Sequence, residues 1–137
     1  MKKIATISFF AIIIIVLILV VVSKIDNSPL MILKVLSGSM EPTINTNELV
    51  LVIKQDQYKE NDIVTYKIDN YFITHRIKEM TNDQVITKGD NNDDVDKAIE
   101  LSDIKGKVVL IIPAFYSNVF TVIGIVALII LLIIILA

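Results

Sequence analysis

The sequence contains no cysteine and no tryptophan, and its 137 residues include one histidine, four glycines and three prolines. Without cysteine, neither a disulfide framework nor thiolate chemistry is available, so any folded domain depends on its own core. The net charge is −2 and no run of basic residues is present, which argues against nucleic-acid binding because that function needs a basic face. The single histidine is therefore the only imidazole that could take part in catalysis.

Charge is also missing from two long apolar stretches at the ends of the chain. Residues 4–22 would span about 28 Å as a helix, close to the thickness of a bilayer core. This stretch is longer than the core of a cleavable signal sequence, and its exit, Val20 to Lys24, offers no small-x-small cleavage site. No charge appears from Val108 onwards. We therefore predict transmembrane helices over residues 4–22 and 114–137.

The segment between these stretches, residues 23–113, is polar to mixed in composition. It exceeds the length of about 60 residues below which loop charges control topology, so it can be translocated whole. Lys2 and Lys3 favour a cytoplasmic N-terminus, residues 1–3, although lysines also flank both apolar stretches on the loop side. We expect residues 23–113 to form an extracytoplasmic domain on the plasma membrane, in contact with membrane lipid.

Short β-strand patterns fill this domain. Apolar or alternating runs bounded by turn residues predict strands over 30–36, 48–53, 62–68, 71–77 and 84–88. Asp69 and Asn70 separate two of these runs, and both residue types tolerate the positive φ of a tight hairpin turn. Alternation along 71–77 places one set of side chains on a common face, namely Tyr71, Ile73, His75 and Ile77. The domain is expected to be mainly β, with five or six strands.

Ser39 is the first candidate for chemistry. It lies in Leu36 to Pro42, after an apolar run and before a proline, where a strand can pass sharply into a loop with the hydroxyl exposed. Serine is also a common turn residue, so this segment alone does not establish a nucleophile. His75 lies on an apolar face, which disfavours the charged imidazolium and suits a general base. A structural histidine with one hydrogen bond is the alternative.

The segment after Gly89 carries four carboxylates within seven positions. Asp90, Asn92 and Asp94 have the first spacings of a calcium-binding EF-hand loop, but Val95 and Leu101 replace its required glycine and glutamate. We therefore expect no metal and no cofactor. The segment is then either a solvated acidic turn or the source of a carboxylate that orients His75.

Three motifs occur in order along the chain, Ser37 to Pro42, Thr74 to Arg76 and Thr87 to Asn92. Together they closely resemble the type I signal peptidases, in the branch of the endoplasmic reticulum, archaea and some Gram-positive bacteria that has histidine as the general base. The resemblance covers roughly residues 30–113. It implies a small, partly open, β-barrel-like domain, here flanked by the two predicted transmembrane helices.

The resemblance implies roles for individual residues. Ser39 would be the nucleophile, and Ser37 would help the Ser39 backbone amide to form the oxyanion hole. His75 would be the general base. The third member of this branch's triad is an aspartate six residues after Asp90, which gives Asp96.

The acidic segment leaves some of these roles open. Asp90 itself is implied to be an additional important carboxylate. Asp93 and Asp94 lie in a spacer where relatives often carry small or apolar residues, so they remain alternatives to Asp96.

The chain also departs from the family at two turns. Relatives usually have glycine and aspartate before the second and third strands, where this chain has Asn47-Glu48 and Asn61-Asp62. Asparagine visits the left-handed backbone region more readily than other non-glycine residues, so both turns can be kept.

By this resemblance the chain is a membrane-bound serine endopeptidase. Its substrates would be secretory preproteins, whose N-terminal signal peptides it would cleave after small-x-small sites, and the secretion machinery would be a further partner. The alternative from another functional class is a non-enzymatic, membrane-anchored subunit that binds peptide or acts as a scaffold.

Overall fold

The computed structural model describes residues 10–11, 13–16, 28–116, 124 and 127. The helices predicted over residues 4–22 and 114–137 therefore lie largely outside the described residues. Helical backbone is present at residues 13–16 and 114–116. Within the described part of the chain, no helix is both long enough and apolar enough to cross a membrane.

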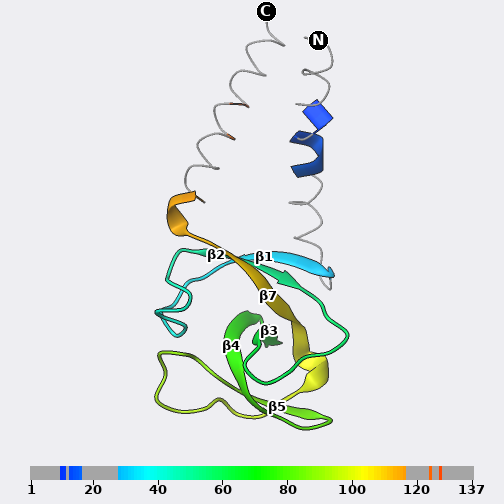
Figure 1. Cartoon of the computed structure of the whole chain (residues 1–137), viewed down its shortest axis with the longest axis vertical. Helices are drawn as coiled ribbons and strands as arrows, with labels where there is room; N and C mark the ends of the chain where they lie inside the picture. The colour runs from blue at the N-terminus through cyan, green and yellow to red at the C-terminus, as the bar shows by residue number, and fades with distance from the viewer. Residues whose placement is uncertain (1–9, 12, 17–27, 117–123, 125–126, 128–137) are drawn as a thin grey trace, which may run out of the picture.

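Seven strands form one antiparallel sheet in the described part of the chain (Figure 1). They are β1 (Leu30–Lys34), β2 (Leu49–Ile53), β3 (Ile63–Ile68), β4 (Tyr71–Met80), β5 (Gln84–Lys88), β6 (Ile99–Glu100) and β7 (Ile104–Ile112). A 3-10 turn, η1 (Leu101–Asp103), joins β6 to β7. The strand order is β1-β2-β7-β3-β4-β5-β6, so β1 and β6 are edges and the sheet is open.

The prediction of a mainly β domain is confirmed, but the expected count of five or six strands is too low. The five expected strands are present, with ends that differ by up to three residues. The missed strands are β6 and β7. In β7, lysines alternate with Gly106 before an apolar run that continues into the C-terminal stretch, so neither part shows a clear strand pattern. Tertiary pairing places β7 between β2 and β3.

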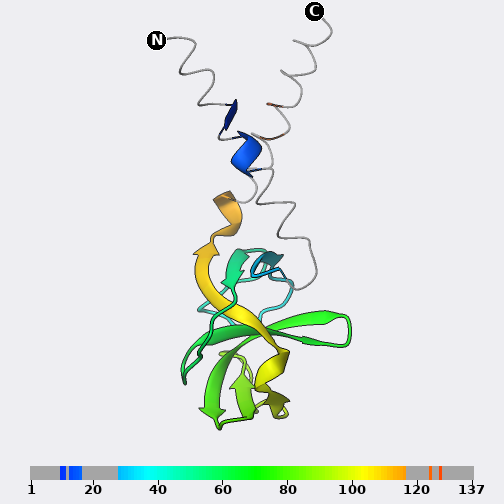
Figure 2. The same cartoon turned by 90° about the vertical axis from the view of Figure 1, so that its right-hand side faces the viewer.

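Left-handed turns precede β2 and β3, as the two asparagines predicted. Asn47 has φ of 73° and Asn61 has φ of 70°. Asp69, in the turn between β3 and β4, also has a positive φ, of 52°. This turn closes the predicted hairpin, in which Ile68 pairs with Tyr71, and its tip projects from the rest of the sheet (Figure 2).

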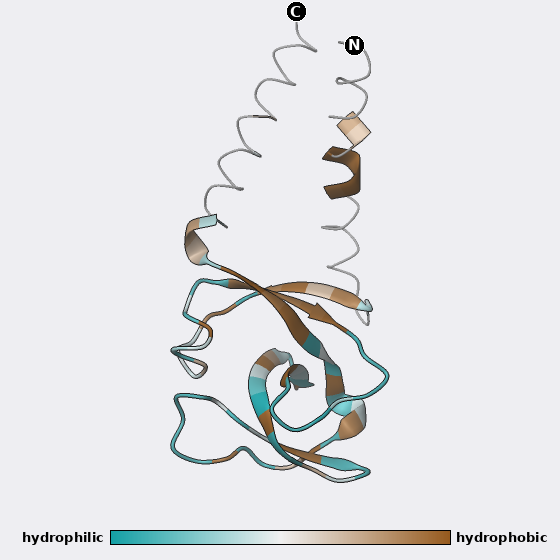
Figure 3. Cartoon of the chain, in the orientation of Figure 1, coloured by the Kyte–Doolittle hydropathy of each residue, from teal (hydrophilic) through white to brown (hydrophobic). Residues whose placement is uncertain are grey.

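Two apolar clusters make up the core. Figure 3 shows hydrophobic segments, in brown, along the strands that supply them. The first packs mainly between β3, β4 and β5, and contains Val64, Tyr66, Ile77, Val85, Ile99 and Ile104. The second lies under β1, β2 and the loop between them, and contains Met31, Met40, Ile44, Val50 and Val52. On β7, Gly106 approaches the end of β2 so closely that a Cβ atom there would lie 2.7 Å from the carbonyl of Ile53. The sheet can therefore curl around both clusters only with glycine at this crossing.

Candidate active site

The loop between β1 and β2 carries Ser39 and is anchored by the residue that follows it. Met40 is buried in the second apolar cluster, and the Ile44 N–H donates to the Met40 carbonyl at 2.9 Å. The Glu41 N–H donates to the Gly38 carbonyl at 3.1 Å, which forms a tight turn around the serine. Ser39 is half-buried, with its backbone held by the core and its hydroxyl facing the sheet.

Ser39, His75 and Asp96 form a continuous chain of hydrogen-bonding groups. His75 Nε2 lies 3.1 Å from Ser39 Oγ, and His75 Nδ1 lies 2.6 Å from Asp96 Oδ2. An ionised carboxylate can only accept a hydrogen bond, so the proton of a neutral His75 resides on Nδ1. The lone pair of Nε2 then faces the serine hydroxyl, as a general base requires.

Each of these three residues comes from a different part of the fold. Ser39 lies in the β1–β2 loop, His75 on β4 and Asp96 in the loop between β5 and β6. The burial of β4 alternates from Thr74 to Lys78, with His75 and Ile77 buried as the predicted common face requires, while Tyr71 is exposed at the hairpin tip. The His75 side chain is 9% exposed and that of Asp96 is 23% exposed. The base is therefore sheltered from water, while the serine stays open to a substrate.

The loop that follows β5, residues 89–98, is hydrogen-bonded to the backbone of the serine loop, which we define as residues 35–48 between β1 and β2. The Asn91 N–H donates to the Ser39 carbonyl at 2.8 Å, and Asn91 Nδ2 donates to the Gly38 carbonyl at 3.2 Å. Gly89 lies against the same segment, because a Cβ atom at this position would be 2.6 Å from the Ser39 carbonyl oxygen. The glycine of this motif is therefore explained by the close approach of two backbones.

Asp90 lies apart from the triad and ties the same loops to β4. The Arg76 guanidinium donates to Asp90 through Nε at 2.9 Å and through Nη2 at 2.7 Å. The Thr43 hydroxyl, in the serine loop, donates to Asp90 Oδ2 at 2.6 Å. The hydrogen bond from Arg76 is the main reason why the pKa of Asp90 lies below its ordinary value.

The remaining candidates from the sequence, Ser37, Asp93 and Asp94, are all exposed, but only Ser37 lies close to Ser39. Ser37 is exposed, and its hydroxyl oxygen lies 3.3 Å from that of Ser39. Asp93 and Asp94 are both exposed on the loop surface. Within the described ranges, no group of three or more histidine, cysteine, aspartate or glutamate side chains is arranged to hold a metal ion.

Two buried hydroxyls at the site were not identified from the sequence. Thr87, on β5, donates to Asp96 Oδ2 at 2.7 Å, and Tyr66, on β3, donates to the same oxygen at 3.2 Å. The predicted hairpin turn was enough to place one of them, Tyr66, near the site. Its register pairs Tyr66 with Ile73, and paired residues share a face, so Tyr66 lies on the His75 side of the sheet.

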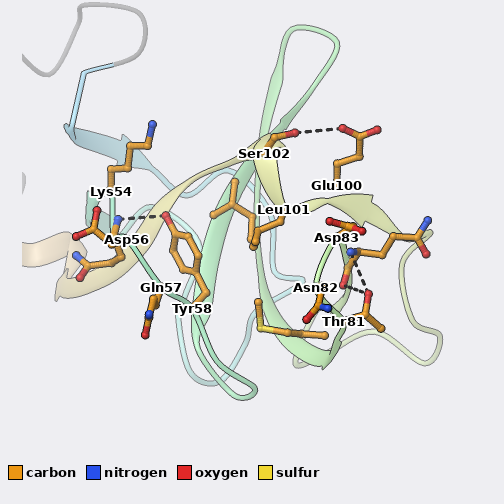
Figure 4. A pocket seen from close by; sticks show the side chains of 14 residues that line it. Lys54, Asp56, Gln57, Tyr58, Thr81, Asn82, Asp83, Glu100, Leu101 and Ser102 are labelled. Carbon is orange, nitrogen blue, oxygen red and sulfur yellow. Dashed lines mark hydrogen bonds between the residues drawn. The ribbon is translucent and has the colours of Figure 1, made fainter.

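An open hollow of about 1150 Å³ lies elsewhere on the domain (Figure 4). Its walls come from the segment after β2, the β4–β5 turn and the β6–η1 region, and they include Tyr58 and Leu101. Several of its polar groups bond to one another, as in the pair of Ser102 and Glu100 at 3.2 Å. None of its lining residues belongs to the Ser39 site, so the two features are separate.

The family model described as Peptidase S24-like matches residues 14–109, which is more than half of the chain. The chain belongs to this family. The match includes all three motifs and each residue of the hydrogen-bonded chain from Ser39 to Asp96.

Several proteins similar to this chain are named as signal peptidases. Signal peptidase I W of Bacillus subtilis (strain 168) is 46% identical over 72 residues, which cover 47% of this chain and 38% of that protein. The signal peptidase complex catalytic subunit SEC11 of Candida dubliniensis is 44% identical over 77 residues, or 51% of this chain and 46% of that subunit. The SEC11 subunit of Metarhizium acridum is 37% identical over 108 residues, which cover 66% of this chain and 63% of that subunit.

The chain thus spans less than two thirds of the length of each of these relatives. One of them comes from a Gram-positive bacterium and the other two come from fungi, and both kinds of source fall within the branch of the endoplasmic reticulum, archaea and some Gram-positive bacteria that the motifs resemble. The relationship to type I signal peptidases of this branch is confirmed.

Proposed function

We propose that this chain is a serine endopeptidase that removes signal peptides from secretory preproteins. The observation that carries the proposal is the contact of His75 with Ser39 on one side and with Asp96 on the other, at 3.1 and 2.6 Å. The names of the relatives support the same reaction. The catalytic residues are then Ser39, His75 and Asp96.

The geometry supports acyl transfer through the serine. His75 Nε2 accepts the proton of Ser39 Oγ as that oxygen attacks the carbonyl carbon of the scissile peptide bond. The resulting oxyanion accepts hydrogen bonds from the Ser39 N–H and the Ser37 hydroxyl. His75 then passes its proton to the departing amine, and a water molecule attacks the acyl-enzyme by the same route. Asp96 stabilises the imidazolium that forms in each step.

A peptide substrate has an edge beside this site to pair with. β1 ends at Lys34, two residues before Leu36 and close to the serine loop, and it is an edge strand that pairs with β2 alone among the described strands. An extended signal peptide can add to this edge through backbone hydrogen bonds. By the resemblance to signal peptidases, small side chains before the scissile bond would then lie in shallow pockets near Ser39, which would account for small-x-small sites.

The proposal includes the membrane. Its support is the apolar composition of residues 4–22 and 114–137, which we assign as transmembrane helices around the catalytic β domain at 23–113. We place residues 1–3 in the cytoplasm and the domain, a partly open barrel, on the outer face of the plasma membrane in contact with lipid. Because the SEC11 relatives are named as subunits of a complex, contact with the secretion machinery is part of the proposal.

A non-enzymatic peptide-binding or scaffold subunit is the rival function. Such a subunit would need the β1 edge but would place no requirement on the tautomer of His75 or on its distance from Ser39. The arrangement of base, acid and hydroxyl therefore favours the enzyme.

The test is cleavage of a preprotein by the full chain reconstituted in liposomes. We expect Ser39→Ala and His75→Ala each to lower turnover on the order of 10⁴- to 10⁶-fold, because each removes a member of a cooperating unit. Ser37→Ala should retain a reduced rate, with a loss of about 10²- to 10³-fold for one oxyanion donor.

Ser102→Ala provides the matched control. Ser102 is an exposed serine that lines the separate hollow, and its substitution should leave cleavage at the wild-type rate. Wild-type cleavage by Ser39→Ala would reject the enzyme. If the variants still bound the preprotein while neither they nor the wild type cleaved it, the scaffold function would stand.

A further inference from the structure

Three donors converge on one oxygen of Asp96. Oδ2 accepts from His75 Nδ1 at 2.6 Å, from the Thr87 hydroxyl at 2.7 Å and from the Tyr66 hydroxyl at 3.2 Å. Only the first of these contacts belongs to the proposed triad. The other two come from side chains that are 0% and 1% exposed, so water does not compete for them.

The register of the sheet explains why these side chains meet. β3 and β5 lie on either side of β4, with Tyr66 opposite Ile73 and Thr87 opposite Ile77. Ile73 and Ile77 share a face with His75, so both hydroxyls flank the imidazole on its own side of the sheet. The Tyr66 ring contacts the His75 ring edge-on, with centroids 6.5 Å apart.

Asp96 itself lies outside the strands and therefore needs such support. Its N–H donates to the carbonyl of Thr87 at 2.8 Å, so one residue of β5 holds both the backbone and the carboxylate of the acid. The Thr87 hydroxyl has one proton and lies within reach of two oxygens, Asp96 Oδ2 at 2.7 Å and the Tyr66 hydroxyl oxygen at 3.1 Å. It donates to Asp96, which is the nearer acceptor. The Tyr66 proton then remains available for Asp96.

Tyr66 acts as a donor throughout the physiological range. Burial raises the pKa of Tyr66 to about 12, so its hydroxyl stays protonated. An ionised carboxylate accepts several hydrogen bonds, and bonds to a charged acceptor are the stronger kind. Two fixed donors on the oxygen that also receives His75 restrict the rotation of the Asp96 side chain.

We propose that Tyr66 and Thr87 are positioning residues, which lock the Asp96 carboxylate so that it keeps His75 in the tautomer that faces Ser39. This inference rests on the proposed function for its catalytic consequence. Its structural content, the state of one imidazole, can be measured without any cleavage.

The single histidine of the chain makes that measurement unambiguous. The full chain is prepared in detergent with isotope-labelled histidine and without a histidine tag, and NMR records the two ring nitrogens and the Nδ1–H proton. In the wild type we expect Nδ1 to be protonated, Nε2 to be unprotonated, and the Nδ1–H proton to be strongly deshielded. Thr87→Val should broaden or abolish this proton signal and mix the tautomers, and Thr87→Ser should restore the wild-type pattern.

Two further variants separate positioning from folding. Tyr66→Phe keeps the ring in the core and removes only the hydroxyl, so it should weaken the signal even if Thr87→Val fails to fold. Thr65→Val is the matched control, because Thr65 is equally buried but bonds to Thr74, at 2.8 Å, away from the triad. It should leave the signal unchanged. An unchanged signal in both Thr87→Val and Tyr66→Phe would overturn the proposal.

Kinetics test the catalytic consequence separately. We expect Thr87→Val to lower kcat by about 10- to 100-fold, the scale of one hydrogen bond to a charged group, with KM within about twofold. Thr87→Ser should recover most of the rate. If the wild type cleaved no preprotein, the proposed function would fail, and the NMR result would still decide whether Tyr66 and Thr87 position Asp96. If both Thr87→Val and Tyr66→Phe had the wild-type kcat, the positioning role would be overturned, and the proposed function would stand.

Discussion

At the scale of single residues, Asp96 is distinguished from its acidic neighbours by contacts and not by charge. Asp93 and Asp94 are exposed, whereas Asp96 is half-buried and meets the only histidine at 2.6 Å. Each of the three could have reached the imidazole on the grounds of sequence distance alone. The hydroxyls that donate to Asp96 come from β3 and β5, on both sides of β4, and these hydrogen bonds distinguish Asp96 from Asp93 and Asp94.

The role of Asp96 can be tested by replacing the carboxylate with an amide. Asp96→Asn should reduce kcat by about 10⁴-fold with the cooperative unfolding transition preserved, because an amide can donate to Nδ1 and so stabilise the wrong tautomer. Preprotein cleavage and thermal unfolding measure the two effects. Asp93→Asn and Asp94→Asn are the controls and should be mild. Loss of cleavage in Asp94→Asn, with Asp96→Asn active, would transfer the role to Asp94.

At the scale of elements, the site depends on two loops that have no regular structure of their own. The serine loop and the loop after β5 are joined by the Asn91 backbone, by the contact of Gly89 with Ser39, and by Thr43 with Asp90. Arg76 connects this pair of loops to β4, the strand that carries the base. The distance between nucleophile and base therefore depends on contacts that take no part in the reaction itself.

Asp90→Asn tests this connection through the pH dependence of stability. The pKa of Asp90 is lowered in the folded state, so its contribution is complete above its ordinary pKa of about 4 and is lost as the pH falls through the folded value. At neutral pH we expect a loss of about 1–3 kcal/mol in the free energy of unfolding. That difference from the wild type should shrink below about pH 4.

Denaturant titrations across this pH range make the measurement. Asp94→Asn, an exposed change of the same kind, should alter the free energy of unfolding by less than about 0.5 kcal/mol at neutral pH. Cleavage by Asp90→Asn should fall together with its stability, because the single amide oxygen cannot accept all the hydrogen bonds that Thr43 and Arg76 donate to the carboxylate. A difference from the wild type that stayed constant with pH would show that the carboxylate charge is not what stabilises the loops.

At the scale of the whole molecule, the chain combines a polar β domain with two apolar ends. The second apolar cluster is formed by residues of β1, β2 and the loop between them, and β7 ends at Ile112, just before residue 114, where the predicted second span begins. A serine loop supported by this cluster would be held near the membrane surface, where a signal peptide emerges from the bilayer. The proposed orientation decides on which side of the membrane the cleavage takes place.

Orientation can be tested by labelling, because the chain has no cysteine of its own. Gln57→Cys places one thiol at an exposed position in the loop between β2 and β3. We expect a membrane-impermeant maleimide to label it on intact cells, and the cysteine-free parent to remain unlabelled. Labelling that required permeabilised cells would put the domain in the cytoplasm.

Features that depend on neighbouring residues could be predicted from the amino-acid sequence. Turn residues and alternation predicted the β3–β4 hairpin, and the two asparagines predicted the left-handed turns that the φ angles at Asn47 and Asn61 confirm. Local backbone preference is set within a few residues, so such features can be predicted from short segments. The resemblance of three motifs to those of type I signal peptidases is what assigned Ser39, His75 and Asp96, and their catalytic roles remain predictions.

Contacts between groups that are far apart in the sequence could be seen only in the folded chain. The insertion of β7 between β2 and β3, and the convergence of Tyr66 and Thr87 on Asp96, depend on pairings between strands that are far apart in the sequence. No periodic pattern encodes these pairings, because they follow from burying two apolar clusters under one curled sheet. The hydrogen bonds between Asp96 and Thr87 fix the path of the loop after β5, and the pairing of β5 with β4 then brings Asp96 to His75.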